Sequence, residues 1–211
     1  VDIDVSLDVN GTIKLDGNYP VGTENVALGD TALDSVQASG NQNTIIGHAA
    51  GTSITTGDDN TAVGHKSSNL NQTGANNVSM GTNSLEKNTV SENTALGTNS
   101  MRQTTTGGNN TAVGSKALCS NTSGANNTAV GLCTLKTNTT GASNSALGIL
   151  ALELNTEGDF NTAIGREALQ SNTTADNNTA VGYKSLEANQ TGANNVAVGN
   201  NALKLNTATG N

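Results

Sequence analysis

Residues 110–126 read N-T-A-V-G-S-K-A-L-C-S-N-T-S-G-A-N, and this 17-residue phrase recurs through most of the chain. Eleven such units follow one another from Asn25 to Asn211. Eight of the ten spacings between unit starts are 17 residues, one is 18 and one is 16. The units begin at Asn25, Asn43, Asn60, Asn77, Asn93, Asn110, Asn127, Asn144, Asn161, Asn178 and Asn195. We count positions within each unit from this asparagine, which is position 1. The nearly fixed period predicts a repeat architecture.

Position 5 is glycine in every unit. A glycine column marks a bend at which a Cβ atom would clash or at which φ must be positive. We therefore predict structural turn glycines at Gly29, Gly47, Gly64, Gly81, Gly97, Gly114, Gly131, Gly148, Gly165, Gly182 and Gly199.

Position 4 is aliphatic or Met in every unit, which predicts a column of side chains in the core. The predicted core column is Leu28, Ile46, Val63, Met80, Leu96, Val113, Val130, Leu147, Ile164, Val181 and Val198.

Position 3 is Ala in nine units, with Ile45 and Ser79 as the exceptions. Neighbouring residues of a strand point to opposite faces, so position 3 is expected to face away from the core. Apolar residues on both faces are typical of a strand that is covered on both sides. Small side chains permit close approach about a symmetry axis, which predicts a subunit interface. The predicted interface column is Ala27, Ala62, Ala95, Ala112, Ala129, Ala146, Ala163, Ala180 and Ala197.

A period of 17 residues is too short for helix-pair repeats, and Asn, Thr and Gly are poor in helix interiors. The period suits one coil of a β-solenoid, whose coils stack at the strand spacing of about 4.8 Å. Each coil is expected to contain a strand, a turn, a second short strand and a turn. Asn at positions 1 and 12 is expected to form ladders along the axis. The predicted fold is all-β: an elongated parallel β-solenoid (β-roll) of eleven coils, about 50 Å long.

The first residues follow a different pattern. From Val1 to Val9 apolar and polar residues alternate, a tight turn follows at Asn10-Gly11, and a second strand pattern runs from Thr12 to Leu15. This predicts an N-terminal β-hairpin. The expected organisation is a hairpin and lead-in cap at residues 1–24 and a β-solenoid repeat domain at residues 25–211.

Composition excludes several classes of partner. The net charge is −8, and the 9 Lys and Arg residues are scattered singly, which argues against nucleic acid. No apolar run approaches the ~18 residues of a membrane span, so membrane insertion is not expected. The aromatic residues Tyr19, Phe160 and Tyr183 lie far apart in the sequence, which argues against a receptor-binding tip in this segment.

No arrangement of residues predicts catalysis or a cofactor. Catalysis needs different residue types in one place, whereas a uniform solenoid repeats one environment, and a G-x-S-x-G elbow is lacking. His48 and His65 share position 6 of consecutive units, so their side chains are expected to stack. Their neighbours in this column, Asp30 and Thr82, do not complete a metal site, and we predict solvated turn residues.

Two further patterns are candidate sites. The run from Asp4 to Gly11 is superficially like a calcium loop, but its strict alternation favours a strand. Cys119 and Cys133 occupy different columns, positions 10 and 7, and are predicted to be free. No catalytic, cofactor-binding or metal-binding residue is therefore predicted, and the chain is not expected to be an enzyme.

The repeat also carries a family resemblance. Units such as 110–114 (N-T-A-V-G) and 195–199 (N-V-A-V-G) resemble the S-V-A-I-G repeat of trimeric autotransporter adhesin heads. The longer phrase N-T-A-V-G-x-x-A-L-x-x-N-T-T-G-A-N resembles repeats in tail-fibre and appendage proteins of tailed bacteriophages, notably those of marine cyanobacteria. The segment 7–15 is similar to one that often precedes such repeats. The adhesin resemblance implies a left-handed roll that assembles as a homotrimer.

We therefore expect the structural shaft of a phage tail fibre or similar appendage, located in the virion and supporting host attachment. Expected partners are copies of the same chain, other fibre or baseplate proteins, and a host receptor bound through a part outside this chain. One alternative is a bacterial surface adhesin or extracellular filament. Another is an ice-binding or other ligand-binding solenoid, because Thr is frequent at positions 13 and 14.

Overall fold

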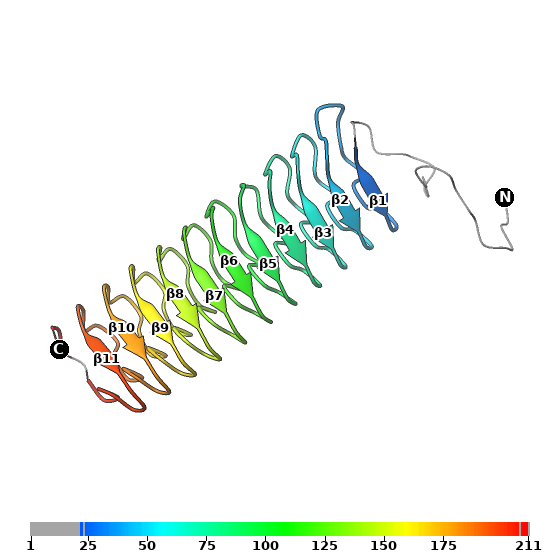
Figure 1. Ribbon diagram of the computed structural model, residues 1–211. Coiled ribbons are helices and arrows are strands. Elements are labelled where there is room, and N and C mark those ends of the chain that lie inside the picture. The colour runs from blue at the N-terminus through cyan, green and yellow to red at the C-terminus, as the bar shows by residue number, and fades with distance from the viewer. Residues whose placement is uncertain (1–21, 23, 207, 211) are drawn as a thin grey trace, which may run out of the picture.

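The computed structural model describes residues 22, 24–206 and 208–210, and they form one elongated solenoid (Figure 1). The predicted hairpin of residues 1–15 lies outside the described residues, as does nearly all of the lead-in to residue 24. The described chain is all-β and winds in coils of about 17 residues, which confirms the predicted circuit.

Each coil contributes one three-residue strand to a single parallel sheet. The strands pair in sequence order, so each contacts only the coil before it and the coil after it (Figure 1). Residues at the same repeat position are partners, as in Thr111↔Thr128. The strands are β1 (Val26–Leu28), β2 (Thr44–Ile46), β3 (Thr61–Val63), β4 (Val78–Met80), β5 (Thr94–Leu96), β6 (Thr111–Val113), β7 (Thr128–Val130), β8 (Ser145–Leu147), β9 (Thr162–Ile164), β10 (Thr179–Val181) and β11 (Val196–Val198).

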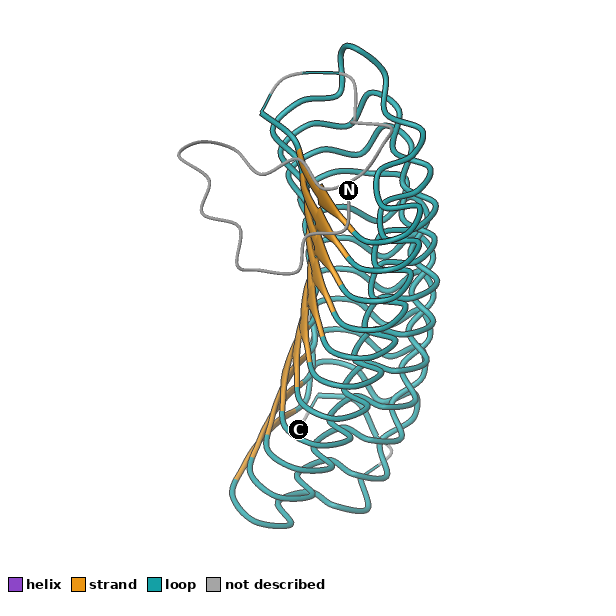
Figure 2. Ribbon diagram, turned by 90° about the vertical axis from the view of Figure 1, so that its right-hand side faces the viewer, coloured by secondary structure: helices purple, strands orange, loops and turns teal. Residues whose placement is uncertain are grey.

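The predicted second strand of each coil is not observed in the described coils. The strands occupy one wall of the solenoid, and turns form the rest of the circuit (Figure 2). In coil 6, Lys116 and Leu118 at positions 7 and 9 have φ values of 58° and 49°. Residues in the left-handed region interrupt an extended strand. Backbone hydrogen bonds nevertheless continue between coils here: the amide of Leu118 donates to the carbonyl of Thr134 at 3.0 Å.

The glycine column has the role that the sequence predicted. All eleven glycines at position 5 have φ between +128° and +137°. A Cβ atom on Gly131 would lie 2.6 Å from the carbonyl oxygen of Gly148 in the next coil. Both the backbone conformation and the close approach of neighbouring coils therefore require glycine.

The assignment of the two strand faces from sequence is wrong. Position 3, predicted as the subunit interface, lies inside the coil and is buried at every coil from β2 to β11. Position 4, predicted as the core, faces outward, and none of its residues is buried. The buried former interface column is Ala62, Ala95, Ala112, Ala129, Ala146, Ala163, Ala180 and Ala197, with Ala27 partly buried. The outward former core column is Leu28, Ile46, Val63, Met80, Leu96, Val113, Val130, Leu147, Ile164, Val181 and Val198.

The opposite wall of the coil explains this exchange. Position 9 supplies fully buried leucines such as Leu118, Leu135 and Leu152, and the neighbouring position 8 is also buried. These leucines fill the interior across from the strand, so only a methyl group fits at position 3. The core is therefore built from positions 3, 8 and 9, and the Ala column is small because it is enclosed.

Two asparagine ladders run along the interior. At position 1, the amide of Asn127 donates to Oδ1 of Asn110 at 2.9 Å, and its Nδ2 donates to the carbonyl of Gly141 at 2.9 Å. At position 12, Nδ2 of Asn138 donates to Oδ1 of Asn121 at 2.9 Å. The position 1 ladder links the described coils throughout. The position 12 ladder has continuous amide-to-amide bonds from Asn121 to Asn189.

Candidate interaction surface

The most distinctive surface is the outward face of the parallel sheet, formed by positions 2 and 4 of every coil. We call it the outer sheet face. Position 2 is mostly Thr, and position 4 is aliphatic or Met throughout. At position 4, Met80 and Leu147 are each 50% exposed and Val198 is 69% exposed. Because the coils stack in register, these side chains form one continuous apolar column.

A column of this kind is a candidate interaction surface. Scattered exposed aliphatic residues are ordinary, but a contiguous apolar patch marks an interaction site. The sequence correctly showed that position 4 is kept apolar in all eleven units. It could not show whether the apolar environment lies inside one coil or between molecules, because both give the same pattern.

The two ends of each strand flank the outer sheet face. Position 6 follows the turn glycine, and in coils 7 and 8 it carries the exposed side chains of Leu132 and Ile149. Position 17 immediately precedes the next strand segment, and in coil 8 it carries Phe160, which is 62% exposed and has φ of 57°. In the sequence, Phe160 stands out only as an aromatic residue far from the other two. Its place in an otherwise polar column is the signal that was missed.

The two histidines lie where the repeat placed them. The rings of His48 and His65 stack with centroids 5.3 Å apart and planes at 9°. Nε2 of His48 lies 3.6 Å from Oδ2 of Asp30, and both side chains are largely exposed. Across the part of the chain that the structure describes, no group of three or more His, Cys, Asp or Glu residues is arranged to hold a metal ion.

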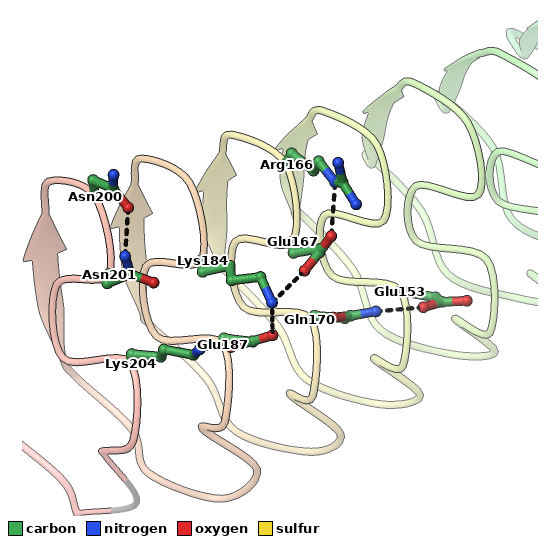
Figure 3. A network of polar contacts seen from close by, with 9 residues as sticks. All are labelled: Glu153, Arg166, Glu167, Gln170, Lys184, Glu187, Asn200, Asn201 and Lys204. Atoms are coloured by element: carbon green, nitrogen blue, oxygen red, sulfur yellow. Dashed lines mark hydrogen bonds and ion pairs between the residues drawn. The ribbon is translucent and has the colours of Figure 1, made fainter.

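A ladder of charged side chains joins the last three coils (Figure 3). Nζ of Lys184 lies 2.9 Å from both Oε2 of Glu167 and Oε1 of Glu187. Arg166 pairs with Glu167 at one end of this ladder, and Lys204 pairs with Glu187 at the other end. The hydrogen bonds from Lys184 lower the pKa of both carboxyl groups below the usual value for Glu. The same bonds, with that to Glu187 largest, raise the pKa of Lys184. This ladder ties coils together and leaves no free catalytic acid or base within it.

The cysteines are free thiols, as predicted. Burial raises the pKa of the Cys119 thiol, and the opposing effects of the nearby cations Arg102, Lys116 and Lys136 are smaller. A thiol whose pKa is raised is less often present as the reactive thiolate, so Cys119 is not an activated nucleophile.

Threonine hydroxyls at position 13 form another axial ladder. Oγ1 of Thr122 donates to the carbonyl of Thr139 at 3.0 Å, and Thr139 and Thr156 repeat the bond. Each hydroxyl hydrogen is therefore directed along the solenoid toward the next coil. The array links coils and does not present a free row of donors at the surface.

No helix long and apolar enough to cross a membrane occurs in the described residues. Comparison with protein-family models, curated proteins and solved structures found no match for this chain.

Proposed function

We propose that this chain is the structural shaft of a fibre, most similar in repeat sequence to the tail fibres and appendages of tailed bacteriophages. In this role it holds a binding tip at a distance from the virion and is not an enzyme. The observation that carries the proposal is the uniform rod with one continuous apolar outer sheet face. Catalysis needs different residue types converging in one place, whereas here the turn glycine and the position 1 asparagine recur in every described coil.

The shaft works by transmitting load through contacts between successive coils. Parallel backbone hydrogen bonds and the position 1 asparagine ladder join every coil to the next. Because these bonds are buried, water does not compete for them, and the coils behave as one stiff body. A parallel solenoid leaves unpaired strand edges only at its ends, which limits lateral aggregation through backbone pairing.

We further propose that the shaft is a left-handed roll assembled as a homotrimer through the outer sheet face. Burial of the position 4 side chains between chains supplies the driving force, at about 25 cal/mol per Å² of apolar surface removed from water. Partners at the ends of the shaft are other fibre or baseplate proteins, and host receptors bind a segment beyond this chain. A bacterial surface adhesin would use the same rod, and imaging of the native particle distinguishes these two sources.

The test is the mass of the purified chain in solution, measured by light scattering together with electron microscopy of negatively stained particles. The wild type is expected to be an oligomeric rod. The double variant V113D/V130D places two carboxylates on the outer sheet face and is expected to give monomers with unchanged circular dichroism. The matched control, S123D/T140D, adds the same charges to exposed positions of the same coils and is expected to remain oligomeric. A monomeric wild type, or equal masses for both variants, would contradict the proposal.

A further inference from the structure

The apolar core of the rod is interrupted at the boundary between coil 3 (60–76) and coil 4 (77–92). Coil 3 carries Ser67 and Ser68 at positions 8 and 9, where coils 6, 8 and 9 carry Ala and Leu. Ala62 is therefore the last member of one buried apolar cluster, and the next cluster begins with Leu85. The second cluster has members in every coil from 4 to 11. The core is thus continuous on each side of this boundary but not across it.

Hydroxyl groups take the place of apolar contacts between these two coils. Oγ of Ser79, at position 3 of coil 4, lies 2.7 Å from Oγ of Ser67 and 2.8 Å from Oγ of Ser68. Such a hydrogen bond adds little net stability, because water offers the same partners when the coils separate. Separation of two leucines would instead expose apolar surface, at a cost in proportion to its area. Opening between coils 3 and 4 therefore costs less free energy than opening between coils joined by leucines.

Backbone contacts of the loop at positions 13 to 15 are also missing at this boundary. Between coils 6 and 7, three successive amides, from position 13 to position 15, donate to the carbonyl of Thr139. Among the described residues, no amide at positions 13 to 15 of coil 3 donates to coil 4, and that of Gly74 donates to Oδ1 of Asn71 in its own coil. The cause is the length of coil 4, in which four residues separate Asn88 from Asn93 and coil 6 has five at the same place.

Other contacts do continue from coil 3 to coil 4. Strand β3 pairs with β4, and the amide of Asn77 donates to Oδ1 of Asn60 at 3.1 Å. The position 12 ladder does not continue, because Nδ2 of Asn88 donates to the carbonyl of Val90 in its own coil. In a stack whose coils contact only their neighbours, stability is the sum of the coils and of the boundaries between them. A boundary that has lost two of its sets of contacts is where the stack separates first.

We propose that coils 1–3 are a separately opening unit, which detaches at this boundary while coils 4–11 stay folded. The apolar cluster of coils 1–3 joins these three coils to one another, so they open together. In the proposed shaft the boundary is a yield point, and the rod remains one stiff body below the load that opens it. The role in the shaft rests on the proposed function, whereas the opening itself depends only on contacts within one chain.

The test is native-state hydrogen exchange of the full wild-type chain, followed by mass spectrometry of its peptides in urea concentrations below the global transition. Amides of coils 1–3 are expected to exchange about tenfold or more faster than those of coils 6–9, with one common urea dependence and a step at the boundary. Fraying from the end of the rod would instead give a gradient from coil 1 to coil 3. A gradient, or equal protection on both sides of the boundary, would overturn the proposal and leave the proposed shaft standing.

A variant that restores the apolar contacts gives the second measurement. S67A/S68L/S79A gives this boundary the residue types found between coils 6 and 7. Protection of coils 1–3 is expected to rise about tenfold, so that the step disappears. The matched control S84A/S100A replaces two buried serines at position 8 of coils 4 and 5 and is expected to leave the step in place. An unchanged step in the first variant, or its loss in the control, would contradict the role of the serines.

A transplant of the three serines covers the case in which the added leucine prevents folding. A117S/L118S/A129S places them at the boundary between coils 6 and 7. A new step in exchange is expected there, in addition to the step of the wild type. Faster exchange spread evenly over all coils, without a new step, would contradict the proposal.

Discussion

Coils 6–11 and coils 1–5 fill the same cross-section in different ways. Coils 6–11 repeat one solution, with Ala at position 3, Leu at position 9 and Asn at position 12, as in Ala129, Leu135 and Asn138. Coils 1–5 depart from it at several positions, and in coils 2–4 the departures at positions 3 and 9 are matched by changes in neighbouring residues. The buried apolar residues accordingly fall into two separate clusters, one in the first three coils and one from Leu85 onward.

Coil 2 exchanges the sizes of two facing residues. Gly51 takes the place of the usual Leu, and Ile45 takes the place of the usual Ala. A Cβ on Gly51 would lie 3.2 Å from Cδ1 of Ile45 and 2.9 Å from Cδ1 of Ile54, so these two isoleucines occupy the space of the missing leucine. The interior of coil 2 therefore stays filled, although both position 3 and position 9 carry a different residue from that of coils 6–11.

Coils 3 and 4 exchange apolar contacts for polar ones. Oγ of Ser67 donates to Oγ of Ser79 at 2.7 Å, and Oγ of Ser68 lies 2.8 Å from the same atom. All three side chains are buried, and they separate the two apolar clusters. A buried hydroxyl costs free energy unless it is hydrogen-bonded, so the three serines must occur together. The comparison shows that facing residues of a coil change together, so that the interior stays filled and its buried polar groups stay hydrogen-bonded.

The largest effect is expected at a turn glycine. In the Gly131→Ala variant the new methyl group would lie 2.6 Å from a backbone oxygen of the next coil, at φ of +137°. We expect a loss of about 3 kcal/mol or more in the free energy of unfolding, measured by urea denaturation. Gly51→Ala is the comparison, because its φ is 52° and its clashes are with the ends of flexible side chains, and a loss of about 1 kcal/mol is expected. Equal losses for the two variants would refute the distinction.

The exchange of sizes in coil 2 predicts strong coupling. Ile45→Ala leaves a cavity and is expected to cost about 3 kcal/mol, and Gly51→Leu overfills the interior at a cost of about 2 kcal/mol. The double variant has Ala at position 3 and Leu at position 9, as in coils 6–11, while Ile54 stays at position 12, and its loss is expected to be about 2 kcal/mol smaller than the sum of the two single losses. Additive losses in a double-mutant cycle would show that the two residues do not share one space.

A smaller effect with the opposite sign is expected at position 12 of coil 5. Thr104 interrupts the asparagine ladder, and its buried hydroxyl has no hydrogen-bond partner. Thr104→Asn extends the ladder between Asn88 and Asn121 and is expected to stabilise the chain by about 1 kcal/mol. Thr106→Asn at an exposed position of the same coil is the control, with no change expected. A destabilised Thr104→Asn variant would contradict the ladder model.

The smallest effect is expected from the charged ladder of coils 9–11, and it depends on pH. Folding holds the pKa values of Glu167 and Glu187 below their unfolded value of about 4.3. Their stabilisation is therefore present above about pH 4.3 and is lost as the pH falls through the folded pKa values. We expect amide exchange in coils 9–11 to accelerate between pH 5 and pH 3 more in the wild type than in Lys184→Met, after correction for intrinsic rates. The same acceleration in both proteins would exclude the ladder as its cause.

The period, the turn glycines and the asparagine ladders could be predicted because each residue type has one physical reason to recur every 17 positions. The identity of the core column could not, because it depends on what lies across the coil. Alanine at position 3 has the same appearance whether a leucine from position 9 or a neighbouring chain covers it. The absence of a second strand in the described coils could not be predicted from the sequence either. Leu118 and its equivalents are left-handed residues, which sequence propensity does not favour.

Same-position pairing between successive coils has an evolutionary consequence. Removing or duplicating any 17 residues within coils 6–11 leaves each remaining glycine above a glycine and each asparagine above an asparagine. Recombination between segments that encode whole coils would therefore change the reach of the rod in steps of about 4.8 Å without creating a new fold. Length is thus a trait that selection could adjust almost independently of sequence.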